Sequence, residues 1–143
     1  YRQLLNFYLN INPYSEVENV LNELKSFNYY NVILTNGNYF MIEQAIKNAK
    51  LESLIDNIIS VEEIRLFKPD PRVYKFACEK LDCSSNDILF FSSNSWDIYG
   101  ALNYGFDSVW INRNSFPIEN LPLKPEKIIT NLNEIFKYLW NEF

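Results

Sequence analysis

The sequence predicts an α/β domain whose parallel sheet is doubly wound by helices. Short apolar segments alternate along the chain with longer segments whose apolar residues recur at helical spacing. The short segments are apolar at nearly every position, which is typical of strands that are buried on both faces. The chain has 143 residues, of which 48% are hydrophobic. That length and composition suffice for one ordinary domain with a buried core.

The strands are predicted from the short apolar runs. In chain order they cover 32–34, 58–60, 88–91 and 109–111, with a short edge strand at 128–129. Helical segments lie between most of them, so neighbouring strands are expected to run parallel. The carboxyl ends of parallel strands meet at one edge of a sheet, where ligands of such folds bind.

The helices are predicted from their apolar spacing and from their caps. In chain order they cover 15–27, 41–49, 71–81, 96–102 and 131–139. Ser15 with Glu18, and Asn131 with Glu134, match the capping-box pattern at two of the helix starts. Pro71 suits the first position of a helix, where its missing N–H leaves no hydrogen bond unmade.

Composition excludes several classes of function. The formal net charge is -5, with the acidic residues scattered along the chain, which argues against a nucleic-acid partner. The absence of histidine excludes triads, metal sites and general bases that depend on it. No apolar run is long enough for a membrane helix, and no secretory signal is visible. We therefore expect a cytoplasmic protein, with Cys78 and Cys83 as reduced thiols near the end of one helix.

Polar residues follow the first strand and stand before the central proline-rich turn. Thr35, Asn36 and Gly37 lead into a helix N-terminus, where backbone N–H groups and the helix dipole favour an anion such as carboxylate or phosphate. An ordinary strand–helix turn is the alternative. Lys68 is held by the proline that follows it, so its ammonium can pair with a carboxylate or stabilise developing negative charge. A solvated surface lysine is the alternative.

A third polar run, Ser-Ser-Asn-Ser-Trp-Asp at 92–97, follows the most apolar strand. Its small polar side chains serve no packing purpose at that position. Asp97 is expected in the first turn of the next helix, where the helix dipole favours an anion. A simple helix cap is the alternative explanation.

Taken together, these segments resemble the haloacid dehalogenase superfamily, and within it the 2-haloacid dehalogenases that act on the L (S) enantiomer. The resemblance rests on Thr-Asn-Gly at 35–37, on Lys68-Pro69 with Tyr74 six residues on, and on the stretches 90–101 and 109–113. It implies a Rossmann-like core and hydrolysis of (S)-2-haloacids to (R)-2-hydroxyacids and halide through an aspartyl ester. It also implies no cofactor, a small 2-haloacid and halide as ligands, and a family in which homodimers occur.

The resemblance assigns substrate-binding roles to four residues. Thr35 and the backbone around Asn36 would hold the substrate carboxylate. The Asn36 amide and Trp96 would border the halide pocket, and Tyr74 would orient the site.

The same resemblance assigns catalytic roles to four other residues. Lys68 would steady the nucleophile and balance the charge of Asp97. Ser92 and Asn94 would position groups around the carboxylates. Asp97 is the candidate for activating the hydrolytic water, since the chain has no histidine to do so.

One position separates this reading from the phosphatases of the superfamily. Those enzymes typically carry Gly-Asp-Ser-x-x-Asp after this strand, and Ser93 stands where the first metal-binding aspartate would be. One carboxylate among hydroxyls is a poor Mg²⁺ site, so we expect no metal. A phosphatase acting on a small phosphorylated metabolite and a non-catalytic anion-binding remnant remain the alternatives.

Two family features are missing from the sequence. No Asp-x-x-Gly-Thr motif is present to supply the nucleophile, and no arginine stands in the place of the one in the family's helical cap. We interpret 1–12 as a remnant of that cap and 13–143 as the C-terminal part of the core, without its first, central strand. We predict that the chain alone is inactive. We also predict that it folds poorly, or closes the gap between the strands at 32–34 and 88–91 by a pairing foreign to the family.

Overall fold

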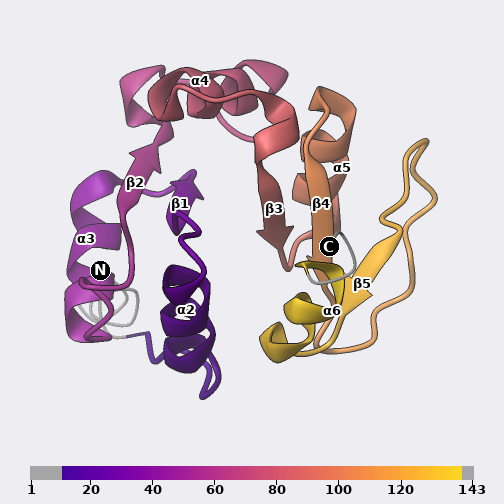
Figure 1. Ribbon diagram of the computed structural model, residues 1–143. Coiled ribbons are helices and arrows are strands. Elements are labelled where there is room, and N and C mark those ends of the chain that lie inside the picture. Colours follow the sequence, from indigo (N-terminus) through magenta and orange to yellow (C-terminus); the bar gives the residue numbers. More distant parts are fainter. Residues whose placement is uncertain (1–10, 140–143) are drawn as a thin grey trace. The chain divides into compact units, whose positions relative to one another are not determined.

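The computed structural model describes residues 11–139, drawn in colour in Figure 1. They belong to two compact units, one ending at Arg65 and the other beginning at Leu66. The interpretation of 1–12 as the end of a cap helix concerns residues that, apart from Ile11 and Asn12, lie outside the described range.

The first unit contains two parallel strands and two helices (Figure 1). Strand β1 (Val32–Thr35) pairs with β2 (Asn57–Ser60) from Val32 opposite Asn57 to Thr35 opposite Ser60. The helices are α2 (Val17–Ser26) and α3 (Tyr39–Asn48), and a 3₁₀ turn (Val61–Glu63) follows β2.

The core of this unit is aliphatic. Ile46, Leu51 and Leu54 form its buried centre. Partly buried side chains from α2, both strands and α3 pack against that centre, namely Val17, Leu21, Ile33, Ile42, Ala49, Ile55 and Ile58. The apolar spacing that predicted the two helices therefore corresponds to the faces that the helices bury.

The predicted capping box at Ser15 is wrong. Helix α2 is capped at Glu16, whose side chain makes no capping hydrogen bond. The N–H of Val17 donates to the carbonyl of Tyr14 over 3.1 Å, which places Ser15 inside a turn before the helix. The start of a helix depends on how the preceding chain enters it, and the spacing of Ser15 and Glu18 alone does not determine that entry.

The second unit contains three parallel strands in the order β3-β4-β5. Its strands are β3 (Leu89–Ser92), β4 (Asp107–Ile111) and β5 (Lys127–Ile129). Its helices are α4 (Pro71–Leu81), α5 (Ser95–Tyr104) and the short α6 (Phe136–Leu139), with 3₁₀ turns at Ser85–Asp87 and Leu132–Ile135. Helix α5 contacts both β3 and β4, which it connects (Figure 1).

Several details of this unit confirm the sequence-based predictions. Every paired strand runs parallel to its neighbour, as expected of an α/β fold. The capping box of Asn131 and Glu134 is present, although the turn it caps is 3₁₀ before α6 begins. Cys78 and Cys83 are free thiols, the first inside α4 and the second just after its end.

Four aromatic rings pack together in the second unit. Tyr74 contacts Phe90, Tyr104 and Phe106, with ring centroids 5.6 to 6.1 Å apart. Phe90 and Phe106 also contact each other. Such edge and stacked contacts stabilise aromatic clusters beyond the area they bury, so the ring of Tyr74 is held firmly between α4, β3 and α5.

The described strands form two separate sheets. Among residues 11–139, β1 is hydrogen-bonded only to β2, and β3 only to β4. The sequence predicts either poor folding or a foreign pairing that closes the gap between the strands at 32–34 and 88–91. Among the described residues no such pairing is present, and both strands keep an unpaired edge there. No helix in this range is long and apolar enough to cross a membrane.

Candidate active site

A buried ion pair joins the segment before α4 to the first turn of α5. Lys68 Nζ lies 2.7 Å from Asp97 Oδ2, and the two side chains are only 9% and 3% exposed. The ammonium also lies 5.4 Å from the centre of the Phe90 ring. A buried charge is strongly unfavourable unless it is paired, so each of these two groups depends on the other.

Tyr74 completes the set of groups around Asp97. Its hydroxyl donates to Asp97 Oδ1 over 2.9 Å, and the Asp97 carbonyl lies 3.2 Å away. Burial, and then the neighbouring carboxylate, raise the pKa of the Tyr74 phenol above its usual range. The phenol therefore stays protonated at neutral pH and acts as a hydrogen-bond donor. Both carboxylate oxygens of Asp97 are thus oriented, one by an ammonium and one by a hydroxyl.

Gly100 makes this arrangement possible. It lies one turn after Asp97 in α5, on the side that faces Tyr74 and Pro69. A Cβ at this position would lie 2.5 Å from the Tyr74 hydroxyl and 2.6 Å from Pro69 Cβ. The missing side chain therefore admits both the phenol and the proline that follows Lys68. A glycine inside a helix costs about 1 kcal/mol relative to alanine, a signal that sequence reasoning could have used and did not.

Ser92 ends β3, and Asn94 lies in the short connection to α5. Ser92 Oγ accepts the N–H of Asn94 over 3.2 Å. Asn94 is the N-cap residue of α5, yet its side chain makes no capping hydrogen bond, which argues against a simple helix cap. The buried Trp110 on β4 donates its indole N–H to the carbonyl of Ser93 over 3.2 Å and so braces the loop. Trp96, the next predicted site residue, is 40% exposed.

Thr35 and Asn36 belong to the first unit, at the end of β1. The Thr35 hydroxyl accepts the N–H of Gly37 over 2.8 Å, which closes a tight turn before α3. A carboxylate of the chain itself lies at the N-terminus of α3, where the sequence predicted a site for a ligand anion. The Glu62 carboxylate accepts the N–H of Tyr39, the first residue of α3, over 2.8 Å.

The structure thus brings Lys68 and Tyr74 into contact with Asp97, and it places Ser92 at the end of β3 and Asn94 in the connection that leads to Asp97. Gly100, Trp110 and Glu62 were not predicted from the sequence, because their importance lies in contacts between distant segments. Within residues 11–139, no three acidic or cysteine side chains gather as a metal site requires.

Parallel strands connected by helices define an α/β protein, and folds of this class bind their ligands at the carboxyl ends of the strands. Comparison with known proteins identifies the family. The model of the haloacid dehalogenase-like hydrolases matches residues 1–111. The chain belongs to that family.

Individual relatives agree with this assignment. The chain is 38% identical over 139 residues to (S)-2-haloacid dehalogenase 4A of Burkholderia cepacia, a match that covers 96% of the chain and 59% of the relative. A crystal structure of a dehalogenase superimposes with a TM-score of 0.92 at 36% identity, covering 96% of this chain and 61% of that one. The structure of the L-2-haloacid dehalogenase of Xanthobacter autotrophicus superimposes with a TM-score of 0.87 at 27% identity. The match covers 94% of this chain and 63% of that one. The chain therefore spans about three fifths of the length of the relatives it matches.

Proposed function

We propose that this chain contributes to the active site of a hydrolase that converts (S)-2-haloacids into (R)-2-hydroxyacids and halide. The observation that carries the proposal is the buried set of Lys68, Asp97 and Tyr74 at the end of β3. It occurs in a chain that is 38% identical to an (S)-2-haloacid dehalogenase. Two charged groups and a phenol are costly to bury, and a catalytic role explains why they are kept.

The proposed reaction has two steps. An aspartate carboxylate attacks C2 of the haloacid, and the carbon–halogen bond breaks as halide leaves with the bonding electrons. This attack inverts C2 and forms an aspartyl ester. Water then attacks the ester carbonyl, which releases the 2-hydroxyacid and restores the aspartate. The attacking aspartate belongs to an Asp-x-x-Gly-Thr motif that these 143 residues do not contain, so we propose that they do not turn over substrate by themselves.

The fixed ammonium of Lys68 suits a role beside that aspartate, because it can keep a carboxylate ionised and in place. Asp97 retains acceptor lone pairs beyond those used by Lys68 and Tyr74, so it can still take a proton from the hydrolytic water. Ser92 and Asn94 would orient groups around these carboxylates. Thr35 and Asn36 would hold the substrate carboxylate, and Trp96 and Asn36 would border the halide. In this scheme 13–143 are part of the core and 1–12 part of the cap.

We also propose that the reaction is independent of metal. The loop after β3 offers Ser93 where the phosphatases of the superfamily have an aspartate, and both oxygens of Asp97 already have partners. These residues do not fit Mg²⁺, because a single carboxylate whose charge is already balanced by the Lys68 ammonium does not supply the several anionic oxygens that Mg²⁺ needs.

The experiment measures halide release from (S)- and (R)-2-chloropropionate by the gene product that contains these residues, with and without EDTA. Release from the (S) acid alone, unaffected by EDTA, is the expected result. Lys68→Ala and Asp97→Ala should lower it at least about 100-fold. Lys75→Ala, on the exposed face of α4, is the matched control and should leave it unchanged.

Two results would contradict the proposal. Magnesium-dependent phosphate release from small phosphorylated metabolites, without halide release, would favour a phosphatase. Halide release from (S)-2-chloropropionate by the purified 143-residue chain would refute its inactivity.

A further inference from the structure

The turn that follows β1 is tied to the segment that follows β2 by hydrogen bonds. The carbonyl of Gly37 accepts a hydrogen bond from the Ser60 hydroxyl over 2.9 Å. The same hydroxyl oxygen accepts the N–H of Glu62 over 3.2 Å. Ser60 is the last residue of β2 and is 2% exposed. It therefore joins the two segments just beyond the last paired position of the strands, Thr35 opposite Ser60.

The Glu62 carboxylate makes a second connection a few residues further on. One oxygen accepts the N–H of Tyr39, and the other accepts the side-chain amide of Asn38. Asn38 is the N-cap of α3, and its side-chain oxygen accepts the N–H of Met41 over 3.2 Å. The free backbone N–H groups in the first turn of α3 therefore have two acceptors. One is the Asn38 side chain that caps the helix, and the other is the Glu62 carboxylate from the turn after β2.

These contacts hold a turn that carries two proposed ligands for the substrate carboxylate. The Thr35 hydroxyl oxygen accepts a hydrogen bond from the Gly37 N–H. The hydroxyl hydrogen can still be donated to a substrate carboxylate. A turn held in one shape loses less conformational entropy when it binds a ligand.

We propose that Ser60 and Glu62 are positioning residues that hold the turn of residues 35–38 in the shape that binds the substrate carboxylate. The inference rests on the proposed function, since that function makes Thr35 and Asn36 ligands. Neither Ser60 nor Glu62 needs to touch the substrate. Their effect is on the strength of carboxylate binding and on the rigidity of the turn.

The chain offers an unusually simple probe of this turn. It contains three glycines, Gly37, Gly100 and Gly105, so ¹⁵N-glycine labelling gives three amide signals. Gly37 reports on the turn, while Gly100 and Gly105 report on α5 and its end. Amide hydrogen exchange at Gly37 is compared in the wild-type chain, Ser60→Ala and Glu62→Ala. Glu52→Ala is the control, because it removes an exposed carboxylate from the same unit.

The expected result is that exchange at Gly37 speeds up at least about fivefold in Ser60→Ala and Glu62→Ala, as for loss of a single hydrogen bond. Exchange at Gly100 and Gly105 should not change. Glu62→Asp, which keeps two acceptor oxygens, should recover part of the protection. Gly37 exchange that is the same in both variants as in Glu52→Ala would overturn the proposal.

The second measurement titrates (S)-2-chloropropionate and (R)-lactate while following the Gly37 signal. The wild-type chain and Glu52→Ala should show a saturable shift, and Ser60→Ala and Glu62→Ala should bind at least about fivefold more weakly. Equal binding in all four would overturn the positioning role alone. A wild-type chain whose Gly37 signal responds to neither acid would overturn the assignment of Thr35 and Asn36, and the positioning role with it. The two failures are therefore distinguishable.

Discussion

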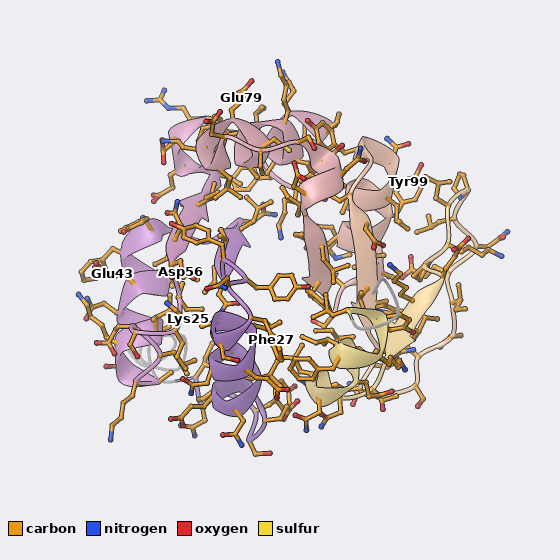
Figure 2. The ribbon with its side chains drawn as sticks, in the orientation of Figure 1. Lys25, Phe27, Glu43, Asp56, Glu79 and Tyr99 are labelled. Atoms are coloured by element: carbon orange, nitrogen blue, oxygen red, sulfur yellow. The ribbon has the colours of Figure 1, made fainter. Side chains whose placement is uncertain are left out.

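Two lysine–aspartate ion pairs, one in each unit, have similar geometry and differ mainly in burial. In the first unit, Lys25 Nζ lies 2.6 Å from Asp56 Oδ1, and the side chains are 36% and 17% exposed. In the second, Lys68 and Asp97 are 2.7 Å apart and only 9% and 3% exposed. Figure 2 labels the first pair, with Lys25 on α2 and Asp56 just before β2. The distances are nearly equal, so distance alone does not distinguish a structural contact from a candidate active site.

The more exposed pair belongs to a set of hydrogen bonds that joins α2 to the segments that precede β1 and β2. Lys25 also donates to the carbonyl of Ser53 over 3.1 Å, and Asp56 Oδ2 accepts the N–H of Asn31 over 2.8 Å. Water screens such a pair, and its net contribution to stability is about 0–1 kcal/mol. The buried pair gives up more solvation than a hydrophobic pair of the same volume would. Stability alone is therefore a poor reason for keeping it, which agrees with the catalytic roles proposed above.

The largest expected effect comes from removing one partner of the buried pair. Lys68→Met leaves the Asp97 charge buried without its cation and should lower the free energy of unfolding of the second unit by about 3–5 kcal/mol. Lys25→Met should lower that of the first unit by less than about 1 kcal/mol. The three tryptophans, Trp96, Trp110 and Trp140, all follow Leu66 in the sequence. Urea unfolding followed by tryptophan fluorescence therefore reports on the second unit, and the Gly37 amide signal on the first.

The double variant Lys68→Met with Asp97→Asn is the control for this comparison. Removing the second charge should restore a large part of the lost stability, because the penalty comes from the unpaired carboxylate. If Lys68→Met lowered the free energy of unfolding no more than Lys25→Met does, burial would not be the property that distinguishes the two ion pairs.

A smaller effect is expected from filling the space that Gly100 leaves beside the buried pair. Gly100→Ala should destabilise the second unit by about 1–3 kcal/mol, the usual cost of overpacking. The nearest atom to the added Cβ is the Tyr74 hydroxyl oxygen, so Tyr74→Phe in the same chain should relieve part of the strain. Urea unfolding of the two single variants and the double variant measures this coupling, which we expect to reach at least about 0.5 kcal/mol.

Gly105→Ala is the matched glycine control. Gly105 has a φ of 110°, and an added Cβ there meets only Ser85 Oγ, at 3.7 Å. Its cost comes from backbone strain, so Tyr74→Phe should not relieve it. If the effects of Gly100→Ala and Tyr74→Phe on the free energy of unfolding were strictly additive, the close approach of Gly100 to the Tyr74 hydroxyl would not be what requires a glycine at this position.

The smallest effect is the response of the exposed pair to acid. Partial burial by itself raises the pKa of the Asp56 carboxyl, but the Lys25 ammonium and the Asn31 N–H outweigh it and lower the pKa below the ordinary value of 3.8. A lowered pKa in the folded state stabilises the fold above the unfolded-state value, and this stabilisation is lost as the pH falls through the folded-state value. The first unit should thus lose stability on acidification below about pH 4.

Unfolding of the first unit, followed by the Gly37 signal at decreasing pH, tests this prediction. Asp56→Asn should flatten the pH dependence, and added salt should weaken it, because exposed charges are screened. A pH dependence that is the same in Asp56→Asn as in the wild-type chain would assign the effect to other carboxyl groups.

Much of the fold could be predicted because its signals are local. Apolar runs such as 109–111 and helical spacing such as that of 71–81 depend on residues close in sequence, and the structure has a strand and a helix there. The start of α2 could not be predicted in the same way, since it depends on a turn closed by Tyr14. The candidate site residues within 92–97 were singled out because a run of small polar side chains directly follows an apolar strand.

The sequence by itself determined the order of strands and helices, the absence of histidine chemistry and the family. Each of these follows from residue identity and short spacing. The tertiary structure alone decided that Lys68 and Tyr74 meet on opposite oxygens of Asp97, that Gly100 leaves room for the Tyr74 hydroxyl and for Pro69, and that Glu62 reaches the start of α3. The physical reason is that burial and hydrogen bonds depend on contacts between segments far apart in the chain. Such contacts produce no pattern among neighbouring residues from which they could be predicted.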